Sequence, residues 1–392
     1  MTAAPVWLAA FVLFCLALHL GGIGLAISAI TRRSPANARR DCPGITVIRP
    51  FCGLENLLEA TLTTTFLADY PTFELLFCVA SESDPAIPLV RRLIAAHPNV
   101  NARLLIGDDK ISGNPKLNNC VKGWRAAKFD YILLSDSNVL LPPDYLTRLV
   151  AQWTPGTGLV TSPPIGTQPD GFWAHLECAF LNSFQARWQL ASARIGNGFA
   201  QGKMLFWQRD VLENAGGIAV LGREMAEDVA STKVVRAAGL HVRLPGRFFA
   251  QPIGRRSYGA VWTRQVRWAR VRRLGFLIYF LPEFLAGAAF PLLATLILVA
   301  NGLTPWAIPA LLVLWYGAEY LLARTGDWPR SPADLVAWIL RDALLPALWV
   351  ASWASSSFEW RGNVMTTQDV SGHDRDHDIP DDPDAETPIH GA

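Results

Sequence analysis

The chain has 392 residues, of which 51% are hydrophobic and 17% charged, with 15 tryptophans and a net charge of +2 at pH 7. Soluble domains carry about 25% charged residues, and this composition excludes a disordered protein, a collagen, a coiled coil and a small disulfide scaffold. The nearly balanced charge gives no sign of a nucleic-acid partner. The six cysteines are scattered without a CxxC pair, which predicts reduced thiols and no zinc site.

The first predicted element is a transmembrane anchor over residues 1–30. Residues 6–30 form an apolar run without a formally charged side chain, and a bilayer core needs about 20 such residues. The alternative, a cleaved signal peptide, is disfavoured because the run is too long and no basic segment precedes it. Arginines follow the run directly, at positions 32, 33, 39 and 40. The positive-inside rule therefore predicts an external N-terminus and a cytoplasmic domain after the anchor.

Residues 41–250 are predicted to form this cytoplasmic domain, with an α/β fold. β-rich runs recur at 45–50, 73–80, 102–107 and 131–136, and segments with helix-like apolar spacing separate them. Apolar strands that alternate with helices indicate a mostly parallel sheet covered on both faces, which binds its ligands beyond the carboxyl ends of the strands. The chain has neither a GxGxxG after the first strand nor a GxxxxGK[ST] motif. A dinucleotide-dependent dehydrogenase and a P-loop ATPase are therefore disfavoured.

Carboxylates stand at the predicted strand ends. Asp136 and Asn138, in LLSDSNVLL, offer oxygen ligands that suit a divalent cation on substrate phosphates; the alternative for Asp136 is an Asx turn. Asp84, in SESDPA, follows another strand, and its alternative is a turn or a helix cap. Lys116 lies in a loop rich in Gly and Asn, where it meets a phosphate or is simply solvated.

Two further segments carry candidate chemistry. Glu227 and Asp228 begin a predicted helix, where carboxylates suit the helix dipole; the functional alternative makes Asp228 a general base that its neighbour tunes. Residues 251–275 form an arginine-rich amphipathic segment with interleaved aromatic residues. Its arginines have two possible roles, contact with anionic lipid at the membrane interface or bidentate binding of a diphosphate.

Residues 276–356 are predicted to form three transmembrane helices, at about 276–300, 303–323 and 335–354. The loop after the first is uncharged and the loop after the second is basic, which agrees with a cytoplasmic start. Within the last run, Arg341 and Asp342 are expected to pair with each other near an interface. The acidic tail over 369–392 is poor in apolar residues and is predicted to be disordered.

The order of these parts resembles the membrane glycosyltransferases of family 21, whose type member is ceramide glucosyltransferase. The resemblance covers nearly the whole chain and rests on the pattern D, D, D, (Q/R)xxRW. It is met here by Asp84, Asp136 and Asp228, and then by Arg264, Arg267 and Trp268. Further matches are NPKLNN around Lys116 and SFEWRGN at 357–363. The metal motif departs from the familiar pattern, because it reads Asp-Ser-Asn instead of Asp-x-Asp, which argues against Asn138 as a direct metal ligand.

The resemblance implies a GT-A nucleotide-sugar-binding domain, Rossmann-like with a mostly parallel sheet, between an N-terminal transmembrane helix and a C-terminal transmembrane bundle. It also implies roles for the matched residues. A nucleotide sugar, expected to be UDP-linked, would be bound by Asp84, Lys116, Asp136, Arg264, Arg267 and Trp268. Asp136 would carry Mg²⁺ or Mn²⁺, and Asp228 would deprotonate a lipid hydroxyl in a single inverting displacement.

The resemblance favours ceramide as the acceptor, with an extended hopanoid (a bacteriohopane polyol) as the alternative within the same family. We expect a multi-pass protein of a bacterial inner membrane whose catalytic domain is cytoplasmic. A processive polysaccharide synthase is disfavoured, because Arg264 stands where those enzymes carry Gln and because three C-terminal spans are too few for a polymer channel. A lipid-binding protein with an inactive domain is disfavoured by the three intact aspartates.

Overall fold

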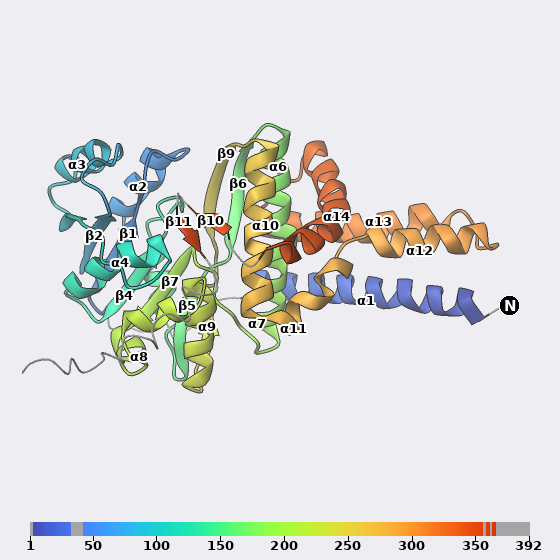
Figure 1. The fold of residues 1–392 in the computed structure, drawn as a ribbon, viewed down its shortest axis with the longest axis horizontal. Coiled ribbons are helices and arrows are strands. Elements are labelled where there is room, and N and C mark those ends of the chain that lie inside the picture. Colours follow the sequence, from blue (N-terminus) through green and yellow to red (C-terminus); the bar gives the residue numbers. More distant parts are fainter. Residues whose placement is uncertain (1–2, 33–41, 356–357, 361–362, 366–392) are drawn as a thin grey trace, which may run out of the picture.

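The computed structural model describes residues 3–32, 42–355, 358–360 and 363–365. Its central element is a seven-stranded sheet in the order β3-β2-β1-β4-β7-β5-β8 (Figure 1). The strands are β1 (Ile45–Pro50), β2 (Phe73–Val79), β3 (Ala102–Ile106), β4 (Tyr131–Ser135), β5 (Thr157–Thr161), β7 (Met204–Gln208) and β8 (His241–Arg243). The four predicted strands are confirmed as parallel neighbours. Strand β7, which the sequence analysis did not predict, runs antiparallel to both β4 and β5.

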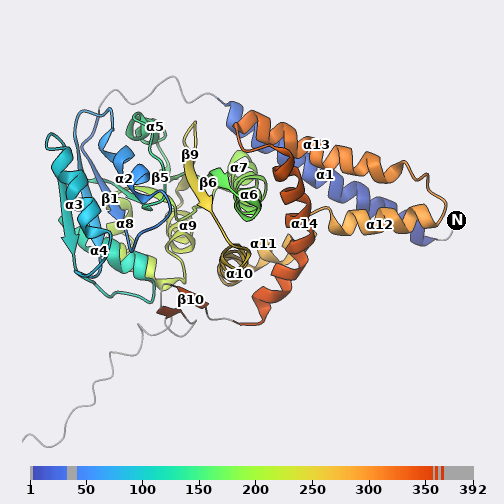
Figure 2. The same cartoon turned by 90° about the horizontal axis from the view of Figure 1, so that it is seen from above.

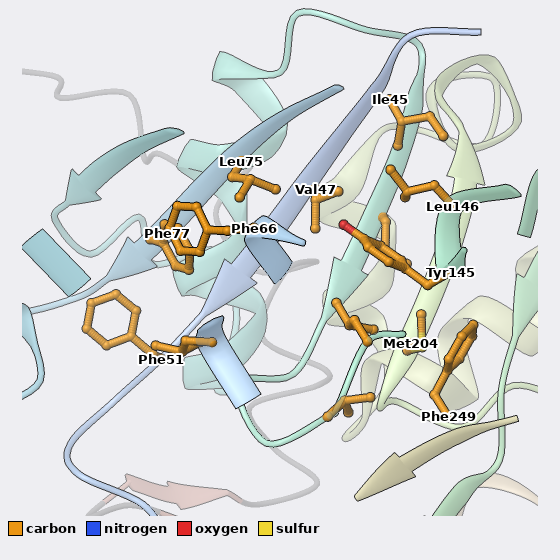
Figure 3. Packing of buried hydrophobic residues seen from close by; sticks show 14 of the residues in the cluster. Ile45, Val47, Phe51, Phe66, Leu75, Phe77, Tyr145, Leu146, Met204 and Phe249 are labelled. Carbon is orange, nitrogen blue, oxygen red and sulfur yellow. The ribbon is translucent and has the colours of Figure 1, made fainter. Parts of the chain in front are cut away.

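Both faces of this sheet are buried, as expected for continuous apolar strands. Successive side chains of a strand point to opposite faces. Val47 and Leu75 accordingly pack on one face with Phe77 and Tyr145 (Figure 3), whereas Ile48 packs on the other. The covering helices are α2 (Leu58–Phe66), α3 (Ile87–Ala96), α4 (Pro115–Ala126), α5 (Tyr145–Val150), α8 (Arg209–Glu213), the 3₁₀ helix η2 (Ile218–Arg223) and α9 (Glu227–Ala237).

A second, two-stranded sheet leads from this domain into two further groups of helices. It pairs β6 (Pro164–Asp170) with β9 (Phe249–Arg255) in parallel. A continuous helical stretch follows β6, consisting of α6 (Phe172–Ala179), a π-helical segment η1 (Phe180–Ala186) and α7 (Arg187–Arg194). After β9 come α10 (Tyr258–Gly275), α11 (Leu277–Phe280) and the 3₁₀ turn η3 (Leu281–Leu285). The predicted amphipathic segment 251–275 is therefore a strand followed by a helix.

Three helices project side by side from the globular part, namely α1 (Ala3–Thr31), α12 (Ala289–Ala300) and α13 (Ala307–Gly326) (Figures 1 and 2). Helix α14 (Pro332–Trp353) runs across the base of these three and packs on α6 and α10 (Figure 2). Within the described ranges, three segments are long and apolar enough to cross a membrane: Pro5–Thr31, Leu277–Ala300 and Pro332–Trp353. The helix nearest to the predicted span 303–323, α13, is not one of them.

Buried charges explain why α14 lies against its neighbours. Arg341 pairs with Asp342 at 2.7 Å, as predicted, and its guanidinium also contacts Glu319 of α13 at 2.7 Å. The carboxylate of Asp342 accepts hydrogen bonds of 3.2 Å from Trp315 Nε1 and Tyr316 Oη. This network joins α14 to α13, and hydrogen bonding among buried charges offsets part of their desolvation cost.

The described residues after α14 include a hairpin beside the globular part. Strands β10 (Phe358–Trp360) and β11 (Asn363–Met365) pair there as an antiparallel hairpin (Figures 1 and 2). The predicted disordered tail over 369–392 and three of the four arginines after the anchor lie outside the described residues.

Candidate active site

A cavity of about 1540 Å³ extends from the carboxyl edge of the main sheet to α1. Six of the seven predicted site residues line it: Lys116 of α4, Asp136 after β4, Asp228 of α9, and Arg264, Arg267 and Trp268 of α10. Elements far apart in the chain therefore place these residues around one space. Asp84 is not one of the described residues that line the cavity.

The loop that carries Asp136 is fixed by a buried arginine of β1. Arg49 donates hydrogen bonds to the carbonyl oxygens of Ser137 (3.2 Å) and Val139 (3.1 Å) and to the hydroxyl of Ser135 (3.0 Å). Thr61 of α2 donates a further bond of 2.6 Å to the Ser137 carbonyl. A guanidinium offers five donors in a rigid plane, and one buried side chain therefore holds the backbone on both sides of the loop.

Two lysines form ion pairs with the Asp136 carboxylate. Lys116 Nζ lies 2.6 Å from Asp136 Oδ1, and Lys203 Nζ lies 2.8 Å from Asp136 Oδ2. The second lysine arrives through the antiparallel pairing of β4 with β7, which also bonds Asp136 N to the Lys203 carbonyl at 3.0 Å. Burial alone would raise the pKa of Asp136, but the two ammonium groups outweigh burial and hold this pKa well below its usual range.

Lys116 is a buried member of the site, not a solvated loop residue. Its side chain is 13% exposed, and its Nζ lies 2.5 Å from Glu227 Oε1 as well as close to Asp136. Burial would lower the pKa of Lys116, but Asp136 and Glu227 outweigh burial and raise it. The start of α4 fixes this position, because the Asn114 side chain caps the helix and donates to Glu227 Oε2 at 2.7 Å. The ammonium group of Lys116 thus connects Asp136, which follows β4, with Glu227, the first residue of α9.

Asp228 stands in the first turn of α9, as predicted. Its carboxylate accepts bonds from the backbone N–H groups of Gly202 (2.9 Å) and Val229 (2.8 Å). Burial and the neighbouring Glu227 raise the pKa of Asp228 to about 6, although Lys116 opposes the shift. A base works best when its pKa is near the operating pH. The helix dipole accounts for the place of Asp228 in the turn, and the raised pKa fits a general base at the cavity wall.

Helix α10 places positively charged side chains along the cavity. Arg264 pairs with Glu177 Oε1 of α6, a fully buried carboxylate, and its guanidinium lies 5.6 Å from the ring centre of Trp268. Arg256 contacts the other oxygen of Glu177 at 3.7 Å. Burial lowers the pKa of Lys203, and Arg264 lowers it further. Lys203, Arg264 and Arg267 all line the cavity, where their positive charges suit an anionic ligand.

Asp84 does not line the cavity, but it holds a loop that does. Its carboxylate accepts hydrogen bonds of 2.8 Å from Gly53 N, in the loop after β1, and from Ala86 N, just before α3. The turn alternative therefore describes its contacts, whereas the N-cap of α3 is Ala86. Phe51 and Cys52, which precede Gly53, do line the cavity. Asp84 thus acts on the cavity through the loop that it holds.

Sequence reasoning missed Lys203, Arg49 and Glu177. Lys203 stands just before the apolar run MLFW, but only the unpredicted pairing of β7 with β4 brings it to Asp136. Arg49 lies inside an apolar strand, and Glu177 inside a helix without a recognised motif. The only local signal for these residues was the presence of a charge within an apolar segment, which implies a buried partner.

The oxygen ligands beside Lys203 fit a divalent cation. Asp136 Oδ2 and Asn138 Oδ1 lie 2.8 and 3.1 Å from the same Lys203 Nζ, so two oxygens converge on one cation position. Such hard ligands suit Mg²⁺ or Mn²⁺. No cluster of three or more His, Cys, Asp or Glu side chains suited to a metal occurs within the described ranges. A divalent cation would therefore need phosphate oxygens of a substrate to complete its coordination.

Comparison with known proteins identifies this architecture. The family described as Glycosyl transferase family 21 matches residues 7–371. Ceramide glucosyltransferase 3 of Caenorhabditis elegans is 26% identical over 367 residues, which cover 90% of this chain and 78% of that protein. Ceramide glucosyltransferase 1 of the same organism is 31% identical over 232 residues, or 59% of this chain and 50% of that protein.

A solved structure shows the same fold. The mannosyltransferase PcManGT from Pyrobaculum calidifontis, in complex with GDP-Man and Mn²⁺, superposes with a TM-score of 0.54 at 18% identity. The match covers 86% of this chain and 99% of that one. The predicted GT-A fold is thereby confirmed.

Proposed function

This chain belongs to glycosyl transferase family 21, and from that premise we propose that it transfers one sugar from a UDP-sugar to a hydroxyl group of a membrane lipid. Family membership and the curated relatives establish a nucleotide-sugar-dependent glycosyltransferase. The lipid acceptor, the inverting course and the roles of individual residues are the proposal.

The observation that carries the proposal is that one cavity has a part lined by charged side chains and a part lined by apolar side chains. Its volume of about 1540 Å³ exceeds the range of about 300–1,000 Å³ that is typical of a single small-molecule pocket. One end is lined by Asp136, Asp228 and Lys203, and the other by apolar residues of α1 such as Leu18 and Leu25. A cavity of this kind suits a nucleotide sugar at one end and an amphiphilic acceptor that enters from the other.

The charged end suits the donor. Lys116, Lys203, Arg264 and Arg267 offer cations to a diphosphate, and Asp136 with Asn138 would hold Mg²⁺ or Mn²⁺ beside it. A divalent cation at this place neutralises charge on the leaving diphosphate. The Asp-Ser-Asn motif argued against Asn138 as a ligand, whereas the convergence of its amide oxygen with Asp136 on one position supports it.

Asp228 would perform the proton transfer. Its carboxylate takes the proton of the acceptor hydroxyl while the hydroxyl oxygen attacks the anomeric carbon. The bond between that carbon and the diphosphate oxygen breaks, and UDP leaves with the electron pair. Arg264 and Lys203 stabilise the charge that develops on the leaving group, which is usually the largest catalytic contribution. A single displacement of this kind inverts the anomeric configuration.

The projecting helices would place the acceptor end in a membrane. Val313 and Leu13 of these helices are exposed apolar residues, as a lipid-facing surface requires. At the far tip, Trp7 and Trp306 are 74% and 78% exposed, and tryptophan is enriched where a protein surface meets the membrane interface. We infer that α1, α12 and α13 enter the bilayer, although α13 is not among the three candidate spans. Helix α14 packs on α6 and α10, and we infer that it lies at the surface on the cytoplasmic side, with the catalytic domain, instead of crossing as the third predicted C-terminal span.

The names of the curated relatives support ceramide as the acceptor and a glucosyl group as the sugar, and a hopanoid polyol remains the alternative. The test supplies purified protein in detergent with Mn²⁺, a panel of UDP-sugars, and either lipid, and identifies the products by mass spectrometry. One hexose added to ceramide is the expected result. Transfer to the hopanoid alone would replace the acceptor. UDP release with a growing polymer and no glycolipid would overturn the proposal.

A further inference from the structure

A glycine of α1 opens a notch in the wall of the cavity. Gly21 lines the cavity, and a Cβ atom placed on it would meet no atom within 4 Å. The neighbouring Gly22 differs, since a Cβ there would contact the ring of Trp188 at 3.6 Å. Glycines in membrane helices commonly allow another helix to approach. No described helix approaches Gly21 in this way, so the notch faces the cavity itself.

Apolar side chains surround this notch. Leu18 and Leu25 lie three residues before and four residues after Gly21, on the same face of α1, and both line the cavity. We call the space bounded by the following residues the apolar limb: Leu18, Gly21, Leu25, Trp188, Ile195, Ile278 and Tyr279.

The apolar limb is open at its rim. Ile278 and Tyr279 of α11 are 82% and 58% exposed although they line the cavity, and Ile195 at the end of α7 is exposed as well. Exposed apolar side chains are costly in water but suit contact with hydrocarbon. Leu18 belongs both to this rim and to a helix that is long and apolar enough to cross a membrane. A rim of this kind suits contact with a bilayer, from which a ligand would reach the limb sideways.

We propose that the apolar limb binds the hydrocarbon part of the lipid acceptor and that this part crosses α1 at Gly21. The inference rests on the proposed function. The limb is continuous with the end of the cavity that holds Asp228, so a lipid whose hydroxyl lies at Asp228 extends toward α1 and the bilayer. The residues that define the limb are uncharged, which matches an aliphatic chain or a fused hydrocarbon ring system. Arg187 and Arg236 also line the cavity, and they form hydrogen bonds with His19 and Asn197.

Helix α1 offers a matched pair of variants. A Cβ at Gly24 also meets nothing within 4 Å, but Gly24 is not one of the described residues that line the cavity. Gly21→Phe fills the apolar limb, whereas Gly24→Phe places the same ring outside it. We expect Gly21→Phe to slow transfer to long-chain ceramide at least tenfold, and Gly24→Phe to transfer at the wild-type rate. UDP binding, measured by calorimetry, stays at the wild-type affinity in both variants, which also verifies folding.

A truncated acceptor gives the second comparison. A ceramide with short acyl and sphingoid chains does not reach Gly21, so Gly21→Phe and the wild type should use it equally well. The same pair of variants is assayed with the hopane polyol, which distinguishes an aliphatic occupant from a ring system. If Gly21→Phe does not bind UDP, Gly21→Leu replaces it in every assay.

The outcomes separate the two claims. Wild-type kinetics of Gly21→Phe on every long acceptor that the wild type uses would overturn the binding site and leave the proposed function intact. Equal impairment of Gly21→Phe and Gly24→Phe would also overturn the site. A wild type that transfers sugar to neither lipid would instead overturn the proposed function.

Discussion

Lys203 Nζ lies 2.8 Å from Asp136 Oδ2, because the antiparallel pairing of β7 with β4 brings the two residues face to face. The same ammonium group lies 3.1 Å from Asn138 Oδ1. A protein cation thus stands between the two oxygens that suit a divalent metal. Metal binding therefore requires Lys203 to move aside, and the donor diphosphate is a suitable new partner for its charge.

The first prediction concerns this competition. Lys203→Met should lower the Mn²⁺ concentration at half-saturation by about tenfold, or about 1.4 kcal/mol, because Asp136 Oδ2 loses its competing cation. Mn²⁺ binding at saturating UDP, whose phosphate oxygens complete the coordination of the cation, is followed by electron paramagnetic resonance and measures the change. Lys233→Met serves as the control, because Lys233 pairs with Glu224 on a more exposed part of α9. Equal Mn²⁺ affinity in the wild type and Lys203→Met would contradict the competition.

The pH dependence of transfer should follow Asp228. Burial and Glu227 raise the pKa of this carboxyl to about 6. The base form is the carboxylate, so kcat/KM should be constant above this pKa and fall about tenfold per pH unit below it. Glu227→Gln removes the neighbouring negative charge, which lowers the pKa of Asp228, so that kcat/KM begins to fall at a lower pH. If kcat/KM falls at the same pH in the wild type and the variant, a group other than Asp228 controls the pH dependence.

Arg264 should show two separable roles. Arg264→Ala removes the short ion pair of the buried Glu177 carboxylate and leaves the longer one to Arg256, at 3.7 Å. We expect a loss of about 2 kcal/mol in the free energy of unfolding. Adding Glu177→Gln removes the unpaired charge and restores the unfolding temperature in detergent. Sugar transfer should stay low in the double variant, because the diphosphate still lacks its arginine. Recovery of transfer along with stability would mean that Arg264 acts only through Glu177.

Arg49 should be essential to the loop after β4. Arg49→Met removes the donors to the Ser137 and Val139 carbonyls, at a cost of about 3 kcal/mol in the free energy of unfolding. Affinity for UDP should fall with it, because Asp136 loses its fixed position. Arg92→Met is the matched control, since Arg92 forms an exposed ion pair with Glu59, and such pairs contribute about 0–1 kcal/mol. Two variants of equal stability would refute this role of Arg49.

Local pattern was sufficient to predict the parallel part of the sheet and most of the candidate site. β1 to β4 are apolar runs with clear boundaries. Asp136, Lys116 and Asp228 stand where a strand ends or a helix begins. In a parallel sheet the carboxyl ends of the strands meet at one edge, so residues at these positions come together without further information.

Long-range pairing decided what the sequence did not reveal. Lys203 reaches Asp136 only because β7 pairs with β4. The sequence of β4 did not indicate which strand would pair with it on the side away from β1. Helix α14 has the composition of a membrane span, but the partnership of Arg341 with Glu319 of α13 is a tertiary contact that composition does not encode. Asp84 follows a strand as Asp136 does, and only its bonds to Gly53 and Ala86 distinguish its place.

The most direct test of the proposed mechanism is the anomeric configuration of the glycolipid formed from UDP-glucose, read from its proton NMR coupling, in the wild type and in Asp228→Asn. The sugar of UDP-glucose is α-linked, and a single displacement with Asp228 as base predicts a β-linked glucolipid. Asp228→Asn should bind UDP normally and form this product at least about a hundredfold more slowly. An α-linked product, or wild-type turnover by Asp228→Asn, would contradict the mechanism.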